Sequence, residues 1–345
     1  MNNRERVITT LEHKKPDRVP YNIWFTKEAC AKMAAFYGDL DFESKPGNCF
    51  VDLGGYDYNY KKIGTNIWED RFGVQWNRTV DKDIGTVCNC VVNPDNIDEY
   101  KFPDPGTDGC FKSNTHTNIP HANSGNFFIV QLGFSLFERA WTLTGMENFL
   151  MAMLSDENFA NKLLDKILEY NLRWIEKALL LDVDAILFGD DWGCQNGLLM
   201  GPKLWSKFIK PKIKKMYQAV KKKGKYVFIH SCGKVDEVFP DLIECGVDLF
   251  NPFQPEVMDV FEMKRRYGKS LSFFGGISVQ RTLPFGTISE TRKEVKILLE
   301  RIGFDGGYIA APSHSIPKDA KVENIAAMID ILKNQKKHYS TKYIG

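Results

Sequence analysis

A regular alternation between short apolar runs and amphipathic helical segments constrains the fold of this chain more than any other feature. Each run is rich in β-branched and aromatic residues and is bounded by turn residues, a pattern that predicts a buried strand. Most runs are followed by a helical pattern, which predicts parallel strands joined by helices. The eight candidate strands are residues 18–25, 50–53, 127–132, 185–191, 225–230, 247–251, 271–275 and 308–311.

Eight β/α units that close into a (β/α)8 TIM barrel are the economical interpretation of this α/β pattern. A doubly wound open sheet is the alternative, but no Gly-x-Gly-x-x-Gly sequence follows an early strand. Residues 54–125 depart from the pattern, because they are rich in Gly, Asn, Asp, Thr and aromatic residues and show little helical periodicity. We expect residues 1–345 to form one barrel domain, with 54–125 inserted as hairpins and loops over the barrel mouth.

Helix signals support the helical segments between the later strands. Ser155 is expected to cap a long helix, because two acidic residues follow it in what would be the first turn. Pro202 suits the first turn of the next helix, which Pro211 should kink and Gly224 should end.

Composition and charge exclude several classes of protein. The chain carries a net charge of +2, with 43% hydrophobic and 26% charged residues, which is typical of a soluble globular protein and gives no reason to expect a nucleic-acid partner. No apolar run approaches the roughly 18 residues that span a membrane, and the polar N-terminus lacks the apolar core of a signal peptide. The 8 cysteines without a secretory signal indicate reduced thiols and a cytoplasmic location.

Polar residues and glycines follow the predicted strands at their carboxyl ends. In a parallel barrel these ends lie on one face, which is where barrel enzymes have their active sites. Glycines there would let a ligand approach the backbone closely. The residues expected to gather at this face are Asp190, Asp191, His230, Cys232, Asn251, Gln254, Gly275, Gly276, Ser313 and His314.

His230 and Cys232 are candidate zinc ligands at the end of one such strand. They are two residues apart, so both can point to one metal ion, and His314 after the last strand could supply a third ligand. Three protein ligands with an open position are typical of a catalytic zinc site. The alternative is a hydrogen-bonded histidine and an ordinary buried thiol. Cys88 and Cys90 could hold a second metal, but a hairpin strand with both thiols on one face is the simpler interpretation.

Asp190 and Asp191 are the candidate catalytic carboxylates. They could act as a general base, ligate a metal or orient His230 from outside the ligand set. They could instead cap the following helix.

Four motifs in this order resemble the uroporphyrinogen decarboxylase superfamily, and most closely its corrinoid-dependent methyltransferases of the methylcobalamin:coenzyme M methyltransferase type. The resemblance covers most of the chain and implies a (β/α)8 barrel. The motifs are Gly189-Asp190-Asp191-Trp192-Gly193, His230-Ser231-Cys232-Gly233, Phe274-Gly275-Gly276-Ile277 and Ala311-Pro312-Ser313-His314-Ser315-Ile316.

One difference argues against uroporphyrinogen as the substrate. The decarboxylases hold carboxylates with arginines in an N-terminal motif similar to Arg-Gln-Ala-Gly-Arg, whereas residues 21–27 here read Tyr-Asn-Ile-Trp-Phe-Thr-Lys. A substrate with many carboxylates needs fixed bidentate cations, and Lys27 does not replace two arginines.

The resemblance implies zinc-dependent methyl transfer between a corrinoid and a small thiol or other acceptor. The methyltransferases bind zinc through His-x-Cys and a later cysteine; this chain has His230, Cys232 and, in place of that cysteine, His314. Methylcobalamin is expected on a partner corrinoid protein, because the chain has no Asp-x-His-x-x-Gly motif. A homodimer is also expected. The alternatives are decarboxylation of a small or tetrapyrrole carboxylate and a non-catalytic corrinoid-binding role. The candidates for cofactor binding are Gly275, Gly276, Asn251 and Gln254.

Overall fold

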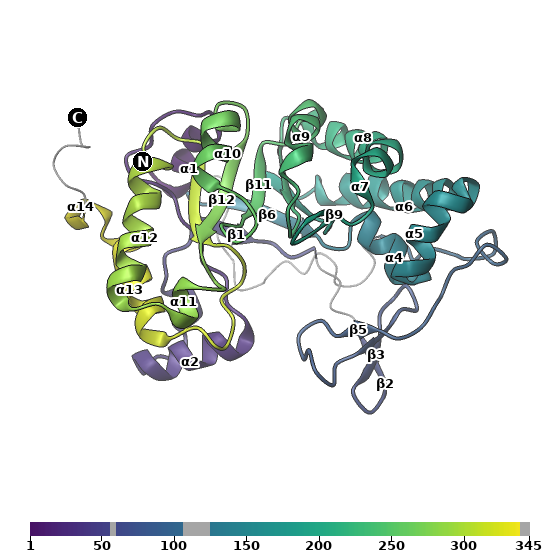
Figure 1. Cartoon of the computed structure of the whole chain (residues 1–345), viewed down its shortest axis with the longest axis horizontal. Helices are drawn as coiled ribbons and strands as arrows, with labels where there is room; N and C mark the ends of the chain where they lie inside the picture. Colours follow the sequence, from purple (N-terminus) through teal and green to yellow (C-terminus); the bar gives the residue numbers. More distant parts are fainter. Residues whose placement is uncertain (56–59, 106–124, 339–345) are drawn as a thin grey trace. The chain divides into compact units, whose positions relative to one another are not determined.

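The computed structural model describes residues 1–55, 60–105 and 125–338. The chain divides into two compact units. The first unit contains the described residues of 1–51, 119–127 and 248–345, and the second contains those of 52–118 and 128–247. Figure 1 colours the elements in chain order.

Parallel strands form the core of the second unit. Their order is β6 (Phe127–Leu132), β7 (Ala185–Gly189) and β10 (Tyr226–His230), and the register places His230 beside Gly189. The strands are apolar on both faces, as expected when helical crossovers cover a parallel sheet. Those helices, teal to green in Figure 1, are α4 (Phe137–Thr144), α5 (Met146–Ser155), α6 (Glu157–Ala178), α7 (Gly201–Leu204), α8 (Lys210–Lys221) and α9 (Phe239–Cys245).

The predicted helix cap at Ser155 and the predicted kink at Pro211 both occur slightly earlier or later in the chain than expected. Ser155 is the last residue of α5, and the cap of α6 is Asp156, whose side chain accepts from Phe159 N at 3.1 Å. The helix around Pro211 is divided by a π-helical turn, Trp205–Ile209, and Pro211 lies in the first turn of α8. Because proline cannot donate to the preceding turn and its ring crowds that turn, a widened turn before it is expected.

The hairpins predicted early in the second unit are present as a four-stranded antiparallel sheet. Its strands, in sheet order, are β2 (Lys61–Gly64), β3 (Ile67–Glu69), β4 (Gln75–Asn77) and β5 (Thr86–Val87). Cys88 and Cys90 follow β5 rather than lying in a strand, and their thiols donate to backbone carbonyls at 3.3 and 3.4 Å. Insertion of 54–125 over a barrel mouth, within one domain of residues 1–345, stays a prediction, and 56–59 and 106–124 lie outside the described residues.

The first unit repeats the βα pattern. Parallel strands follow in the order β11 (Leu249–Phe253), β12 (Ser272–Ile277) and β13 (Tyr308–Pro312), and β1 (Phe50–Asp52) is the short second strand that the sequence predicts. The helices of this unit are α1 (Asn3–Leu11), α2 (Lys27–Tyr37), α10 (Val260–Tyr267), α11 (Thr282–Phe285), α12 (Ile288–Arg301), α13 (Val322–Lys333) and α14 (Gln335–His338).

The prediction of a first strand over residues 18–25 is wrong. The segment makes only two isolated parallel bridges, Tyr21 with Ala310 and Phe25 with Ile316. Between them the Asn48 side chain accepts from Ile23 N at 2.9 Å and donates to Ile23 O at 3.0 Å. The backbone groups that would continue a ladder are therefore used by a side chain.

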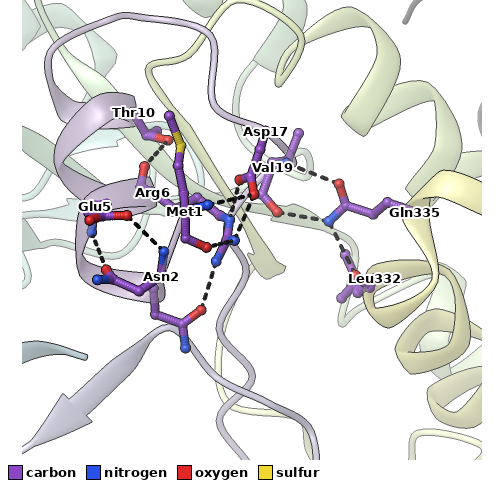
Figure 2. Close-up of polar contacts among 10 residues, drawn as sticks. Met1, Asn2, Glu5, Arg6, Thr10, Asp17, Val19, Leu332 and Gln335 are labelled. Atoms are coloured by element: carbon purple, nitrogen blue, oxygen red, sulfur yellow. Dashed lines mark hydrogen bonds and ion pairs between the residues drawn. The ribbon is translucent and has the colours of Figure 1, made fainter. Parts of the chain in front are cut away.

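Polar contacts tie α1 to Asp17, just before this extended segment, and α14 to Val19 within it (Figure 2). The buried Arg6 of α1 donates to both carboxylate oxygens of Asp17 at 2.7 and 3.0 Å. The Gln335 side chain accepts from Val19 N at 3.0 Å and donates to Val19 O at 2.8 Å. A capping box of Asn2 and Glu5 begins α1. Among the described residues, no helix is long and apolar enough to cross a membrane.

Candidate functional site

His230 and Cys232 lie where β10 ends and its loop begins. The His230 Nε2 and Cys232 Sγ atoms are 3.4 Å apart, and both side chains are half-buried. Two ligands at tetrahedral positions around zinc, with bonds near 2.3 Å to sulfur and 2.05 Å to nitrogen, would be about 3.6 Å apart. The spacing of this pair therefore fits two zinc ligands.

The loops after β7 and β10 pack against each other closely enough to require glycine. A Cβ atom on Gly193 would lie 2.7 Å from Cys232 O, and one on Gly233, where φ is +88°, would lie 2.7 Å from Gly193 O. The Asp191 carboxylate bridges the same loops, because Oδ1 accepts from Cys232 N at 2.7 Å and lies 3.9 Å from His230 Nε2. Asp191 therefore holds the backbone of one candidate ligand and faces the other.

Asp190 is fully buried and bonds to a different part of the second unit. Its carboxylate accepts from the backbone N–H groups of Leu136, Phe137 and Glu138 at 3.2, 3.1 and 2.8 Å, and from Trp192 Nε1 at 2.6 Å. Burial raises the pKa of Asp190 to about 6 although these donors favour the ionised form. Asp190 thus caps α4, a helix much earlier in the chain, and not the helix that follows it.

Glu138 lies beside Asp190 and Asp191, and the sequence did not predict it as a site residue. Burial, followed by the negative charges of Asp191 and Asp190, raises the pKa of Glu138 well above its ordinary value, and its carboxylate accepts from Asp191 N. The available signal was weak: Glu138 is an acidic residue shortly after the end of β6, the end at which the other candidates lie.

The Asp191 carboxylate adds negative charge beside Cys232. Burial, and then the charge of Asp191, raises the pKa of the Cys232 thiol. Within the described residues, no ion pair joins Asp190, Asp191 or Glu138 to a lysine or an arginine. A cation beside Cys232 would offset the charge of Asp191, and an imidazole with a thiolate is a donor set that suits zinc.

The candidates for cofactor binding lie in the first unit. Much of their hydrogen bonding and close packing is to other atoms of the protein. Asn251 is buried and its Nδ2 donates to Phe274 O at 2.9 Å. A Cβ atom on Gly275 would lie 2.6 Å from Phe253 N, and one on Gly276 would lie 2.7 Å from the Tyr308 hydroxyl. The two glycines of β12 thus permit close packing with the neighbouring strands.

Gln254 and His314 complete the predicted residues of the first unit. Gln254 is buried, and its backbone carbonyl accepts from Met258 N at 3.2 Å. His314 is exposed and lies two residues after the end of β13, next to the buried Ser313. Ligand binding by Asn251, Gln254 and the two glycines stays a prediction, as does metal binding by His314.

Comparison with a solved structure supports the α/β part of the predicted fold class. A methyltransferase from Methanosarcina mazei superposes with a TM-score of 0.72 at 16% sequence identity, and the match covers 97% of this chain and 99% of that protein. The likeness agrees with a TIM-barrel-like α/β fold built on parallel strands.

Sequence comparison finds curated relatives over part of the chain. A protein named Methylcobamide:CoM methyltransferase MtaA from Methanosarcina barkeri is 25% identical over 187 residues, which is 54% of this chain and 52% of that protein. The MtaA of the M. barkeri strain Fusaro is 24% identical over the same length. The chain therefore spans about half the length of the curated relatives it matches.

The family model described as Uroporphyrinogen decarboxylase (URO-D) matches residues 88–335. This range includes β6 to β13 and every candidate site residue described above. The chain belongs to the uroporphyrinogen decarboxylase family.

Proposed function

We propose that this chain is an enzyme that transfers a methyl group between a corrinoid on a partner protein and a small thiol or other acceptor. The observation that carries the proposal is the His230–Cys232 pair, with donor atoms 3.4 Å apart at the end of β10. The matched MtaA proteins are named methylcobamide:CoM methyltransferases, which supports the same class of reaction.

The proposed zinc ligands are His230, Cys232 and His314. The third ligand is assigned from its place after the last strand, where the resembling methyltransferases have a cysteine. When bound, zinc would supply a Lewis acid that lowers the pKa of a thiol in its open position.

The carboxylates have positioning roles in this proposal. Asp191 holds Cys232 N and faces His230, so it fixes the orientation of both ligands. Asp190 holds the first turn of α4 and thereby places the Glu138 carboxylate at the same cluster.

The proposed reaction is a nucleophilic displacement at the methyl carbon. The acceptor loses a proton, a bond forms between its sulfur and the methyl carbon, and the cobalt–carbon bond breaks with both electrons remaining on the corrinoid. In the reverse direction, the electron pair of the reduced corrinoid would attack the methyl carbon of a methoxylated or methylamine-type substrate, and the departing oxygen or nitrogen would take up a proton. A cytoplasmic location and a homodimer stay predictions.

Metal content tests the ligand set. We expect elemental analysis to find about one zinc per chain in the wild-type protein and little in His230→Ala, Cys232→Ser or His314→Ala. Cys194→Ser is the matched control, because Cys194 is an exposed cysteine in the same unit as Cys232. Zinc-free wild-type protein, or full occupancy in Cys232→Ser, would contradict the proposal.

Turnover tests the reaction. The zinc-loaded protein is expected to demethylate methylcobalamin in the presence of a thiol, which the corrinoid absorbance reports, and Cys232→Ser is expected to be inactive. A zinc-loaded protein that transfers no methyl group but releases carbon dioxide from a small carboxylate would favour the decarboxylase alternative.

A further inference from the structure

A small cavity in the second unit lies beside the first turn of α4. Its volume is about 50 Å³. The groups around it include an arginine of α4, aromatic rings and a second arginine. The lining residues that matter here are Arg139, Arg71, Asp70, Phe72, Phe134 and Tyr170.

Arg139 brings a buried positive charge to this cavity. Its side chain is 10% exposed, and the guanidinium carbon lies 3.8 Å from the centre of the Phe72 ring and 5.6 Å from that of Phe134. The two aromatic rings contact the guanidinium group but accept no conventional hydrogen bond from its N–H groups. The five N–H donors of the guanidinium therefore need other partners.

The one carboxylate that contacts Arg139 is largely used by other donors. Asp70 Oδ2 lies 3.4 Å from Arg139 Nη1, which is long for a charge-assisted hydrogen bond. The same carboxylate accepts from Phe72 N at 2.8 Å, Val74 N at 3.0 Å and Trp76 Nε1 at 3.1 Å. Within the part of the chain that the structure describes, Asp70 is the one hydrogen-bond acceptor of Arg139.

The chemistry and the size of the cavity identify the class of ligand. A guanidinium presents paired N–H groups that match the two oxygens of a carboxylate. A cavity that holds benzene has a volume of about 150 Å³, roughly three times the volume found here. A group of one or two carbon atoms fits the space, whereas an aromatic ring does not.

We propose that this cavity is a binding site for a small aliphatic carboxylate, of the size of formate or acetate, held by Arg139. The site goes beyond the proposed methyl transfer, because none of its lining residues belongs to the ligand set or to the three carboxylates of that cluster. The proposal can therefore fail or hold independently of zinc binding.

Calorimetry in chloride-free buffer tests the proposal with acetate as the probe. We expect the wild-type protein to bind acetate, and to bind acetamide and benzoate at least tenfold more weakly, because the first lacks the charge and the second exceeds the space. Arg139→Gln is expected to lose acetate binding, and Arg139→Lys to weaken it about tenfold. Arg265→Gln, at an exposed arginine of the first unit, is the matched control and should bind acetate as the wild type does.

A second variant keeps the test decisive if Arg139→Gln fails to fold. Arg71 lines the same cavity but is half-buried, so Arg71→Glu should fold, bring a negative charge to the cavity and weaken acetate binding several-fold. Cys232→Ser should bind acetate unchanged, which separates this site from the zinc proposal. Equal binding of acetate and acetamide, no acetate binding by the wild type, or unchanged acetate binding in Arg71→Glu would overturn the proposal.

Discussion

Asp190 and Asp191 are adjacent in the chain, but their carboxylates bond to different structures. Asp190 accepts three backbone N–H groups at the start of α4, and Asp191 accepts from the loop that carries Cys232. The sequence predicts two acidic residues at a strand end and cannot distinguish these roles, because the backbone groups that Asp190 accepts from lie more than 50 residues earlier in the chain.

Conservative substitutions at the two aspartates should therefore have different effects. In Asp190→Asn, an amide NH₂ group would face N–H donors in a buried site, so we expect the free energy of unfolding to fall by about 1–3 kcal/mol. In Asp191→Asn, the remaining carbonyl oxygen can still accept from Cys232 N, so stability should change by less than about 0.5 kcal/mol while zinc occupancy falls. Denaturant titrations and elemental analysis measure the two effects. Equal loss of stability in both variants would contradict these roles.

At the scale of elements, the sequence predicts the buried strands well, but it does not predict segments whose backbone is bonded by distant side chains. The apolar runs at 127–132, 185–191 and 225–230 correspond to β6, β7 and β10 within two residues, because burial on both faces leaves a strong signal. The extended segment 18–25 has a similar apolar content but is bonded by the Asn48 side chain, a tertiary contact that periodicity does not reveal. The cap that Asp190 gives to α4 escapes prediction for the same reason.

The glycines of β12 provide a test of close strand packing. A Cβ atom on Gly276 would lie 2.7 Å from the Tyr308 hydroxyl at a φ of +98°, so we expect Gly276→Ala to destabilise the protein by about 2–4 kcal/mol. Gly224→Ala is the matched control, because its φ is +69° but no atom lies within 4 Å, and it should cost only about 1–2 kcal/mol. Adding Tyr308→Phe to Gly276→Ala should recover part of the loss. Equal costs at the two glycines would contradict a packing role.

The contact between α1 and the segment after it should make stability depend on acid pH. Burial alone would raise the pKa of Asp17, but its hydrogen bonds to Arg6 and to the N-terminal ammonium group lower that pKa from 3.8 to about 2. Folding therefore favours the ionised form of Asp17. Its contribution to stability is present above pH 4 and is lost as the pH falls from about 4 to 2. The difference in free energy of unfolding between wild type and Asp17→Asn should shrink across that window. A constant difference from pH 5 to pH 2 would show that the Arg6–Asp17 pair does not act in this way.

At the scale of the whole molecule, the order of the strand-end motifs predicted the family, and the contacts between the loops explain why those motifs contain their residues. Gly193 and Gly233 are needed where two loops touch, and Asp191 joins those loops beside the His230–Cys232 pair. Glu138 and the cavity at Arg139 were not predicted, because both depend on how α4 packs within the second unit.

Zinc binding should be visible in the stability of the entire chain. A ligand that binds only the folded state stabilises it by RT ln(1 + [L]/Kd), which is about 2.7 kcal/mol at a concentration 100 times Kd. An unfolding entropy of about 2.1 cal/mol/K per residue, over 345 residues, converts this into a rise in Tm of about 4 °C. A strong chelator should therefore lower the Tm of the wild type and of Cys194→Ser by about 4 °C and leave that of Cys232→Ser unchanged. If the chelator shifts Cys232→Ser as much as the wild type, the stabilising metal binds elsewhere, and Cys232 is the buried thiol of the alternative interpretation.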